Sequence, residues 1–440
     1  MEGNMSLERA AFSSKLGMVM AAAGSAVGLG NLWRFPYVAA QSGGGAFLII
    51  YLAIVATVGL TMVLIESALG MRAKTDAVGA LKAINPHFGF IGGLGILAGS
   101  IIVPYYCVIG GWIIAYITES FSLSGLENFE DHFSTFIASP VPPAVYFALF
   151  LGLTAFIVYR GIQNGIEKSC KIMMPALFVL LLVLMARSLT LPNALEGVKF
   201  FFKPDFSKIT GDTFLQALGQ AFFSLSVGMG IYITFGSYAN TECKVFKTMW
   251  PVPTLDTLVS LLTGLTIFPA VFAFGISMNA GPSLVFITFP KIFAAIPFGA
   301  FFSLVFFVLL LMAALTSSMS LMEVVVTFLC DQWKMTRKKA VVSYSLVSLV
   351  CGVLVSLSFG KLGWFKIGGK ILFDQFDFLA SNILLPTGGF LICIAAGWVL
   401  GVDKLNVFHS KTAEKAFAFS VRYITPAAVA TVLLNVLGLI

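Results

Sequence analysis

Two apolar stretches of the chain contain glycines and serines where an uninterrupted helix would be expected. Residues 24–31 read GSAVGLGN, and residues 224–230 read SLSVGMG. A glycine inside a helix costs about 1 kcal/mol relative to alanine, and unwound backbone persists inside a bilayer only where protein or a water-filled cavity satisfies it. Close helix packing through small residues is the alternative explanation. The recurrence of the pattern favours two broken helices.

Broken membrane helices expose main-chain groups that can bind ions. The N-terminus of a half-helix presents N–H groups and a positive dipole to an anion such as a carboxylate. Freed carbonyl oxygens, together with Asn31 and Ser224, offer hard ligands for a monovalent cation, and neither stretch contains a cysteine or a histidine. The residues therefore predict a site that holds a carboxylate and an alkali ion.

The rest of the sequence must position these stretches within a membrane. Of the 440 residues, 58% are hydrophobic and 11% are charged, whereas about a quarter of a soluble domain is charged. The apolar residues form about eleven runs that are long enough to span a bilayer as helices. We therefore expect an all-α, polytopic membrane protein. The expected spans are 15–38, 44–70, 88–122, 142–160, 164–186, 214–238, 252–279, 298–331, 337–358, 371–400 and 421–440.

The two interrupted spans are the first and the sixth. This spacing predicts a single transporter domain, residues 1–440, built as a five-plus-five inverted repeat with helices 1 and 6 broken at mid-membrane. The first repeat would cover about 15–186, the second about 214–400, and an extra helix about 421–440.

The distribution of positive charge predicts the orientation. With the N-terminus inside, 18 of the 27 lysines and arginines fall in inner connections, as the positive-inside rule requires. We therefore expect a multi-pass protein of the cell inner (plasma) membrane, with a cytoplasmic N-terminus and an outer C-terminus. Because the basic residues follow the membrane face, a nucleic-acid partner is not expected. The six scattered cysteines and three histidines, which lie near polar connections, predict no metal cluster.

Several ordered motifs resemble those of the neurotransmitter:sodium symporter family. They are residues 24–36, which end in NLWRFP, residues 43–47 (GGGAF), Tyr105-Tyr106, residues 165–175, residues 222–230 and residues 315–318 (LTSS). The match covers essentially the whole chain. Eleven helices instead of twelve resemble a bacterial amino-acid:sodium symporter subgroup with a LeuT-like fold, which is itself the type case of broken-helix transporters.

This resemblance implies two sodium sites. The first would use the Ala26 carbonyl, the side chains of Asn31, Ser224 and Asp256, and the substrate carboxylate. The second would use the carbonyls of Gly24, Val27 and Ala313 and the hydroxyls of Thr316 and Ser317. Without the resemblance, Thr316 and Ser317 would be interpreted as helix-packing hydroxyls.

Asp256 departs from the asparagine that is usual at this place in the family. A carboxylate within a membrane helix is costly and indicates a functional partner, for which we take the first sodium ion. Animal relatives need chloride near here, and a fixed negative charge could replace it. We therefore expect that chloride is not required. Ser260, one turn further on, aligns with the chloride-region serine of the family.

The substrate is expected to be a small α-amino acid. Monoamine carriers of the family have an aspartate where this chain has Gly28, so a substrate carboxylate has room here. An uncharged pocket makes a charged side chain expensive to bury and favours an apolar or aromatic one. The residues expected to contact the substrate are Ser25, Ala26, Leu29, Gly30, Ile102, Tyr106, Phe223, Ser224, Ser226, Met229, Ser317 and Leu321.

The resemblance also implies gates on both sides of the pocket. Arg34 and Asp377 would form an outer ion pair above a lid of Tyr106 and Phe223. An inner latch would comprise Arg9, Asp331, Phe12 and Tyr238. Glu66 and Gln220 are expected to brace the broken helices, and the Gly165–Pro175 spacing indicates local unwinding of the fifth helix.

Two other classes of function compete with sodium symport. A proton-coupled amino-acid carrier on the same scaffold would use Asp256, Glu66 or Glu323 as its relay. A membrane-embedded enzyme lacks support because no nucleophile–base group falls within the spans. The sequence leaves open the oligomeric state, the preferred amino acid and the number of sodium ions per cycle, for which we expect two.

Overall fold

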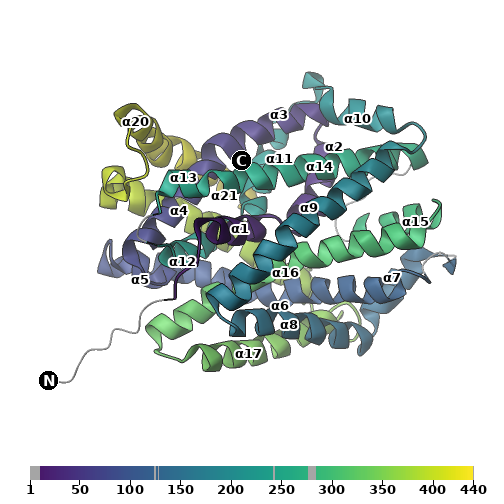
Figure 1. Ribbon diagram of the computed structural model, residues 1–440, viewed down its shortest axis with the longest axis horizontal. Helices are drawn as coiled ribbons and strands as arrows, with labels where there is room; N and C mark the ends of the chain where they lie inside the picture. Colours follow the sequence, from purple (N-terminus) through teal and green to yellow (C-terminus); the bar gives the residue numbers. More distant parts are fainter. Residues whose placement is uncertain (1–9, 123–124, 127, 241–242, 276–283, 440) are drawn as a thin grey trace.

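The computed structural model describes residues 10–122, 125–126, 128–240, 243–275 and 284–439, and these are almost entirely helical (Figure 1). Within this part of the chain, extended pairing is limited to two isolated bridges. Among the described residues, nine helical segments are long and apolar enough to cross a membrane, and a tenth span is bent by 50° at a break. The expected all-α, polytopic architecture is confirmed.

The first half of the chain supplies the first bent span and four continuous ones. Its elements are α1 (Lys15–Ala26), η1 (Gly30–Arg34), α2 (Phe35–Gln41), α3 (Gly45–Ile54), η2 (Val55–Gly59), α4 (Leu60–Ala73), α5 (Ala77–Lys82), η3 (Pro86–Phe88), α6 (Gly89–Glu119), α7 (Phe129–Ala138), α8 (Pro142–Tyr159), η5 (Ile162–Glu167), α9 (Lys168–Leu189) and α10 (Ala194–Phe202).

The second half begins with the other broken helix. Its elements are η6 (Phe206–Lys208), α11 (Gly211–Ser224), α12 (Ile231–Ser237), α13 (Val245–Met249), α14 (Pro251–Phe274), η7 (Leu284–Thr288), α15 (Phe289–Ala294), α16 (Gly299–Gln332), α17 (Arg337–Leu357), α18 (Leu372–Asp377), η8 (Phe378–Leu384), α19 (Leu385–Ile394), η9 (Ala395–Gly401), η10 (Val402–Leu405), α20 (Lys411–Phe419), η11 (Ser420–Ile424) and α21 (Thr425–Val436).

Both predicted breaks are present. Helix α1 ends at Ala26 and is followed by the cap residue Val27, whose backbone is extended (φ −68°, ψ 106°), and the chain turns by 50° before η1 and α2 continue the span. Helices α11 and α12 are separated by residues 225–230, in which Ser226, Gly228 and Gly230 have positive φ. A Cβ on Gly228 would also lie 2.6 Å from the Leu385 carbonyl oxygen. The positive φ and the close approach explain the glycine.

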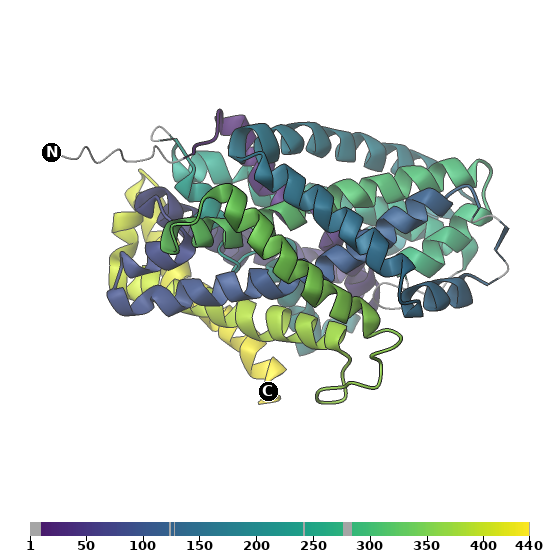
Figure 2. The ribbon, with the colours of Figure 1, turned by 90° about the horizontal axis from the view of Figure 1, so that it is seen from below.

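The two broken helices lie inside the bundle. Helix α1 packs against α9, α14 and α16, and α12 packs against α4. Helix α6 packs against α8, α16 and α17, and Figures 1 and 2 show these long helices running beside one another. Figure 1 places the short helices α7, α10 and α15 at one end of the bundle and α5 and α20 at the other.

The main departures from the predicted spans are at their ends. The last span begins at Lys411 instead of residue 421, because the amphipathic α20 continues through η11 into α21. Helix α14 ends at Phe274, capped by Gly275 in the left-handed conformation, and the rest of the predicted span 252–279 lies outside the described residues. Neither difference moves a candidate site residue.

Candidate functional site

The side chains of Asn31, Ser224 and Asp256 meet between the two breaks. Asn31 Nδ2 lies 2.7 Å from Asp256 Oδ1 and 2.9 Å from Ser224 Oγ. Ser224 Oγ donates to both carboxylate oxygens of Asp256, at 2.9 and 3.0 Å. All three side chains are buried. Three of the predicted ligands of the first sodium site are thus in mutual contact, although they come from three helical segments.

Two further hydroxyls surround this cluster. Ser260 Oγ accepts from Asn31 Nδ2 at 2.9 Å, and Tyr51 donates to Asp256 Oδ2 at 3.3 Å. Asn31 Oδ1 accepts from the Gly28 N–H at 2.9 Å, so the amide nitrogen faces the carboxylate. A half-turn about the Cβ–Cγ bond would direct the amide oxygen toward a cation beside Asp256.

The residues of the second predicted sodium site lie between α1 and α16. Thr316 Oγ1 donates to the Ala313 carbonyl at 3.0 Å, and Ser317 Oγ donates to the Ser25 carbonyl at 3.3 Å. A Cβ on Gly24 would lie 3.2 Å from the Thr316 Cβ. The hydroxyls of α16 are therefore packed directly against the end of α1, where the extended Val27 turns its carbonyl away from the helix axis.

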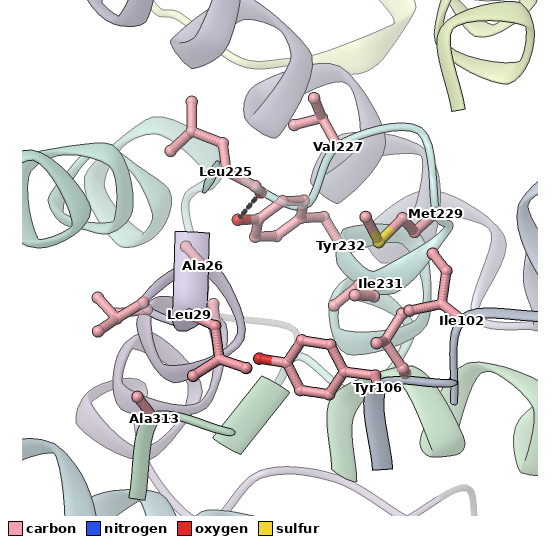
Figure 3. Packing of buried hydrophobic residues seen from close by; sticks show 14 of the residues in the cluster. Ala26, Leu29, Ile102, Tyr106, Leu225, Val227, Met229, Ile231, Tyr232 and Ala313 are labelled. Atoms are coloured by element: carbon pink, nitrogen blue, oxygen red, sulfur yellow. Dashed lines mark hydrogen bonds between the residues drawn. The ribbon is translucent and has the colours of Figure 1, made fainter. Parts of the chain in front are cut away.

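One cavity of about 40 Å³ is bordered by all twelve residues expected to contact the substrate. Gly28 and Tyr105 complete its lining, which contains no charged side chain. In Figure 3, Ile102 and Tyr106 come from α6, and the Tyr106 hydroxyl points toward Leu29. The twelve residues are Ser25, Ala26, Leu29, Gly30, Ile102, Tyr106, Phe223, Ser224, Ser226, Met229, Ser317 and Leu321.

A side chain at Gly28 would force its neighbours in the cavity to move. A Cβ at this position would lie 2.6 Å from Ser317 Oγ and 3.3 Å from the Tyr106 hydroxyl. Across the same cavity, Ser226 Oγ donates to the Ser25 carbonyl at 3.0 Å and joins the two unwound stretches. A side chain at position 28 would therefore occupy the space between the breaks.

Buried polar side chains brace the unwound backbone, as expected. Glu66 Oε1 accepts from the Gly228 N–H at 2.6 Å, and Gln220 Nε2 donates to the Gly30 carbonyl at 3.1 Å. The Tyr232 hydroxyl donates to the Leu225 carbonyl at 2.6 Å (Figure 3). These bonds satisfy main-chain groups that lost their helical partners.

A vestibule of about 360 Å³ lies on the other side of Tyr106 and Phe223, and both Arg34 and Asp377 line it. The Arg34 guanidinium donates to the Gly219 carbonyl at 3.4 Å and lies 4.9 Å from the Phe223 ring centre. Asp377 accepts instead from Tyr105 and Ser381, at 3.0 and 2.9 Å. Arg34 and Asp377 thus face one vestibule with separate partners, and their ion pair stays a prediction for a closed outer gate.

The opposite side of the cavity is sealed. Phe12 is 2% exposed, its N–H donates to the Tyr238 carbonyl at 3.0 Å, and its ring packs edge-on against Phe235 and Tyr238. The Tyr238 hydroxyl donates to Glu323 at 2.8 Å. Phenylalanine at position 12 is therefore well packed, although the family usually has tryptophan.

Of the two charged residues of the predicted latch, the structure describes Asp331. Asp331 Oδ2 accepts from the Asp76 N–H at 2.8 Å and from Thr75 at 3.2 Å. Asp76 caps α5, and burial raises the pKa of its carboxyl. Arg9, the predicted partner of Asp331, lies outside the described residues.

The sequence interpretation missed a second contact of the residues before α1, which Glu167 forms. Its carboxylate accepts from the Ser13 N–H at 2.7 Å, from Ser13 Oγ at 2.6 Å and from Ser14 Oγ at 3.1 Å. Lys171, one turn along α9, lies 2.7 Å from the same carboxylate. Glu167 lies two residues after Gly165, in the segment expected to unwind. This position was the signal in the sequence that could have indicated the contact.

The chain matches the sequence pattern of the sodium:neurotransmitter symporter family over residues 9–127 and 132–438. The chain is a member of this family. It is 39% identical to YhdH, an uncharacterized sodium-dependent transporter of Bacillus subtilis, over 98% of both chains. It is 29% identical to a sodium- and chloride-dependent taurine transporter of Rattus norvegicus, over 90% of this chain and 72% of that one.

The solved structure of MhsT in complex with L-phenylalanine has the same fold. The TM-score is 0.89 at 41% sequence identity, over 97% of this chain and all of MhsT. This symporter therefore has the expected LeuT-like fold, and its family consists of sodium-dependent transporters and not of enzymes. The competing proton-coupled mechanism finds no support in these similarities.

Proposed function

We propose that this symporter uses sodium to import a neutral, apolar or aromatic α-amino acid by alternating access. The observation that carries the proposal is the uncharged cavity between the two breaks, which lies directly beside the buried cluster of Asn31, Ser224 and Asp256. Such a pair of neighbouring sites suits a carboxylate that is bound together with an alkali ion.

In the proposed complex, the first sodium is bound by the Ala26 carbonyl, Asn31, Ser224, Asp256 and the substrate carboxylate. The second is bound by the carbonyls of Gly24, Val27 and Ala313 and the hydroxyls of Thr316 and Ser317. The contact of Ser317 with Ser25 at 3.3 Å supports this second site, because it brings a hydroxyl of α16 to the unwound end of α1.

The substrate carboxylate would be held by the N–H groups of Leu29 and Gly30 and by the Tyr106 hydroxyl. Its ammonium would contact the carbonyls of Ala26, Phe223 and Ser224 and the Ser226 hydroxyl. The cavity of about 40 Å³ is tight, so an aromatic side chain requires the flexible Met229 to adjust. L-phenylalanine bound to MhsT supports this substrate class.

Chloride is not required in this proposal, because the buried carboxylate of Asp256 already supplies a negative charge beside the first sodium. No lysine or arginine within the described residues forms an ion pair with Asp256, so a bound sodium ion would balance that charge. The chloride dependence of the rat taurine transporter would then not extend to this chain.

The proposed cycle closes the outer vestibule after sodium and substrate bind. Arg34 would move from Phe223 to Asp377, while Tyr106 and Phe223 cover the substrate. Release inward would break the latch of Phe12, Tyr238, Asp331 and Arg9. With a cytoplasmic N-terminus and an outer C-terminus in the plasma membrane, repeats of about 15–186 and 214–400 would move relative to each other.

Uptake into proteoliposomes tests this function. A sodium gradient should drive uptake of radiolabelled L-phenylalanine, replacement of sodium by choline should abolish it, and replacement of chloride by gluconate should leave it unchanged. Each of the twenty amino acids serves as competitor, and we expect apolar and aromatic ones to compete. Uptake that follows a pH gradient in choline, or competition mainly by lysine or glutamate, would contradict the proposal.

A further inference from the structure

A groove on the surface of the helical bundle lies between α8 and α17. It has a volume of about 370 Å³ and an almost wholly apolar lining. Helices α8 and α17 pack side by side, as Figures 1 and 2 show. The middle of the groove is open at Gly152, where an added Cβ would meet no atom within 4 Å. The groove is separate from the substrate cavity, because the two share no lining residue.

Two basic side chains lie at one end of this groove. The Arg160 guanidinium lies 5.5 Å from the ring centre of Phe156, and Lys338 Nζ lies 5.6 Å from that of Tyr159. Phe156 and Tyr159 both line the groove. The apolar channel therefore leads to a pair of cations held over two aromatic rings.

This end of the groove is rigidly built. Arg337, the first residue of α17, donates to the Val158 carbonyl near the end of α8, from Nε at 2.9 Å and Nη2 at 2.8 Å. It also forms an ion pair with the buried Glu323 of α16. Because Arg337 already has these partners, Arg160 and Lys338 are the cations available to a ligand in the groove.

We infer that the α8–α17 groove is a binding site for one anionic phospholipid, with an acyl chain along the apolar lining and the headgroup phosphate between Arg160 and Lys338. A groove buries more of a chain than a smooth helix surface does, and each buried methylene adds stabilisation. Basic residues near the membrane surface attract anionic headgroups. The site therefore selects its lipid by charge and retains it by chain burial.

A second copy of the protein is a poorer occupant. A two-fold dimer places the same surface patch of each copy against the other. Packing through this groove would bring Arg160 and Lys338 of one copy toward those of its partner, which is unfavourable without an intervening anion.

Native mass spectrometry of the full chain in detergent tests the site. The protein is titrated with phosphatidylglycerol or with phosphatidylcholine of identical acyl chains. Wild type should retain one phosphatidylglycerol per protomer with a preference of roughly 25-fold, because each basic residue contributes about fivefold. The Arg160→Gln, Lys338→Gln double variant should lose this preference. The matched Lys411→Gln, Lys415→Gln variant, which removes two exposed lysines of α20, should keep it.

A second pair of variants tests the apolar part of the groove. Gly152→Leu fills the groove and should weaken the retained lipid at least tenfold. Gly93→Leu, at another open glycine in α6, should not. Equal retention of both lipids by wild type, or equal effects of the paired variants, would overturn the inference. Dimers that Gly152→Leu converts to lipid-free monomers would also overturn it and would assign the groove to a second copy.

Discussion

Asp256 carries a carboxylate that three neutral side chains contact: Asn31, Ser224 and Tyr51. Its substitution by asparagine keeps the hydrogen-bonding shape but removes the charge that a sodium ion would balance. We expect Asp256→Asn to raise the sodium concentration for half-maximal substrate binding roughly 10- to 100-fold. We also expect chloride to stimulate the residual uptake.

Equilibrium binding of labelled substrate, titrated with sodium chloride or sodium gluconate, measures both effects. Asp374→Asn, at a carboxylate on α18, is the matched control and should behave as wild type. An unchanged sodium requirement in Asp256→Asn would remove Asp256 from the ion site. A sodium requirement that rises equally in both salts would refute only the link to chloride.

The addition of a single methyl group at Gly28 tests the substrate cavity. Because an added methyl would lie 2.6 Å from Ser317 Oγ, Gly28→Ala must displace that hydroxyl from the Ser25 carbonyl. Overpacking of this kind costs about 1–3 kcal/mol, so substrate affinity should fall roughly 10- to 100-fold. Gly93→Ala, where the added methyl meets open space, should leave affinity unchanged in the same binding assay.

Most candidate site residues were predictable because glycine-rich stretches mark where membrane helices break. Asn31 and Ser224 lie in or beside those stretches, and the family resemblance added Asp256. Tyr51 was not predictable, since a lone tyrosine in an apolar span carries no sign that it contacts a carboxylate 205 residues away. Such a contact depends on how the folded chain brings Tyr51 of α3 to Asp256 of α14, which single-residue patterns do not encode.

At the scale of the elements, Glu167 joins the start of the fifth span to the residues before α1. Its carboxylate accepts three hydrogen bonds from Ser13 and Ser14, and each hydrogen bond to a charged group contributes about 1.5–3 kcal/mol. Glu167→Gln should therefore loosen the inner side. We expect amide hydrogen exchange of residues 13–24 to accelerate at least tenfold.

Glu196→Gln, an exposed acid in α10 that pairs with Lys199, is the matched control and should leave that exchange unchanged. Exchange that rises over the whole chain in Glu167→Gln would indicate global destabilisation. Unaltered exchange over residues 13–24 would show that Phe12 and Tyr238 hold the inner side without Glu167.

The number and order of spans could be predicted because length and hydropathy determine them. The π-helical stretches η1, η5 and η8 could not, since they depend on how neighbouring helices displace a hydrogen bond within a turn. The amphipathic helices α10 and α20 were also missed. Each is too short or too polar to register as a span, and a search for helical periodicity outside the apolar runs would have found them.

At the scale of the whole molecule, Phe12 is buried on one side of the substrate cavity, while the vestibule on the other side leads to Arg34 and Asp377. Their ion pair would form only when the vestibule closes. We therefore expect Arg34→Gln to lower the initial uptake rate at least tenfold and to change equilibrium substrate binding less than threefold. Arg187→Gln, at an arginine over Phe302, should change neither. Equal losses of binding and uptake in Arg34→Gln would instead place Arg34 in the substrate site.

The number of sodium ions coupled to one substrate would set how far the symporter can concentrate its cargo. A charge that crosses 100 mV gains about 2.3 kcal/mol, and a tenfold sodium gradient adds about 1.4 kcal/mol. Two ions per neutral amino acid would supply roughly 7 kcal/mol, or about 10⁵-fold accumulation, whereas one ion would support only about 500-fold. The reversal potential of substrate-dependent current in proteoliposomes distinguishes these cases without the error that leakage introduces into accumulation. Thr316→Val, which removes a hydroxyl from the second site alone, should shift that potential from the two-ion toward the one-ion value. A wild-type potential at the one-ion value would mean that only one of the two proposed sites moves its ion across the membrane.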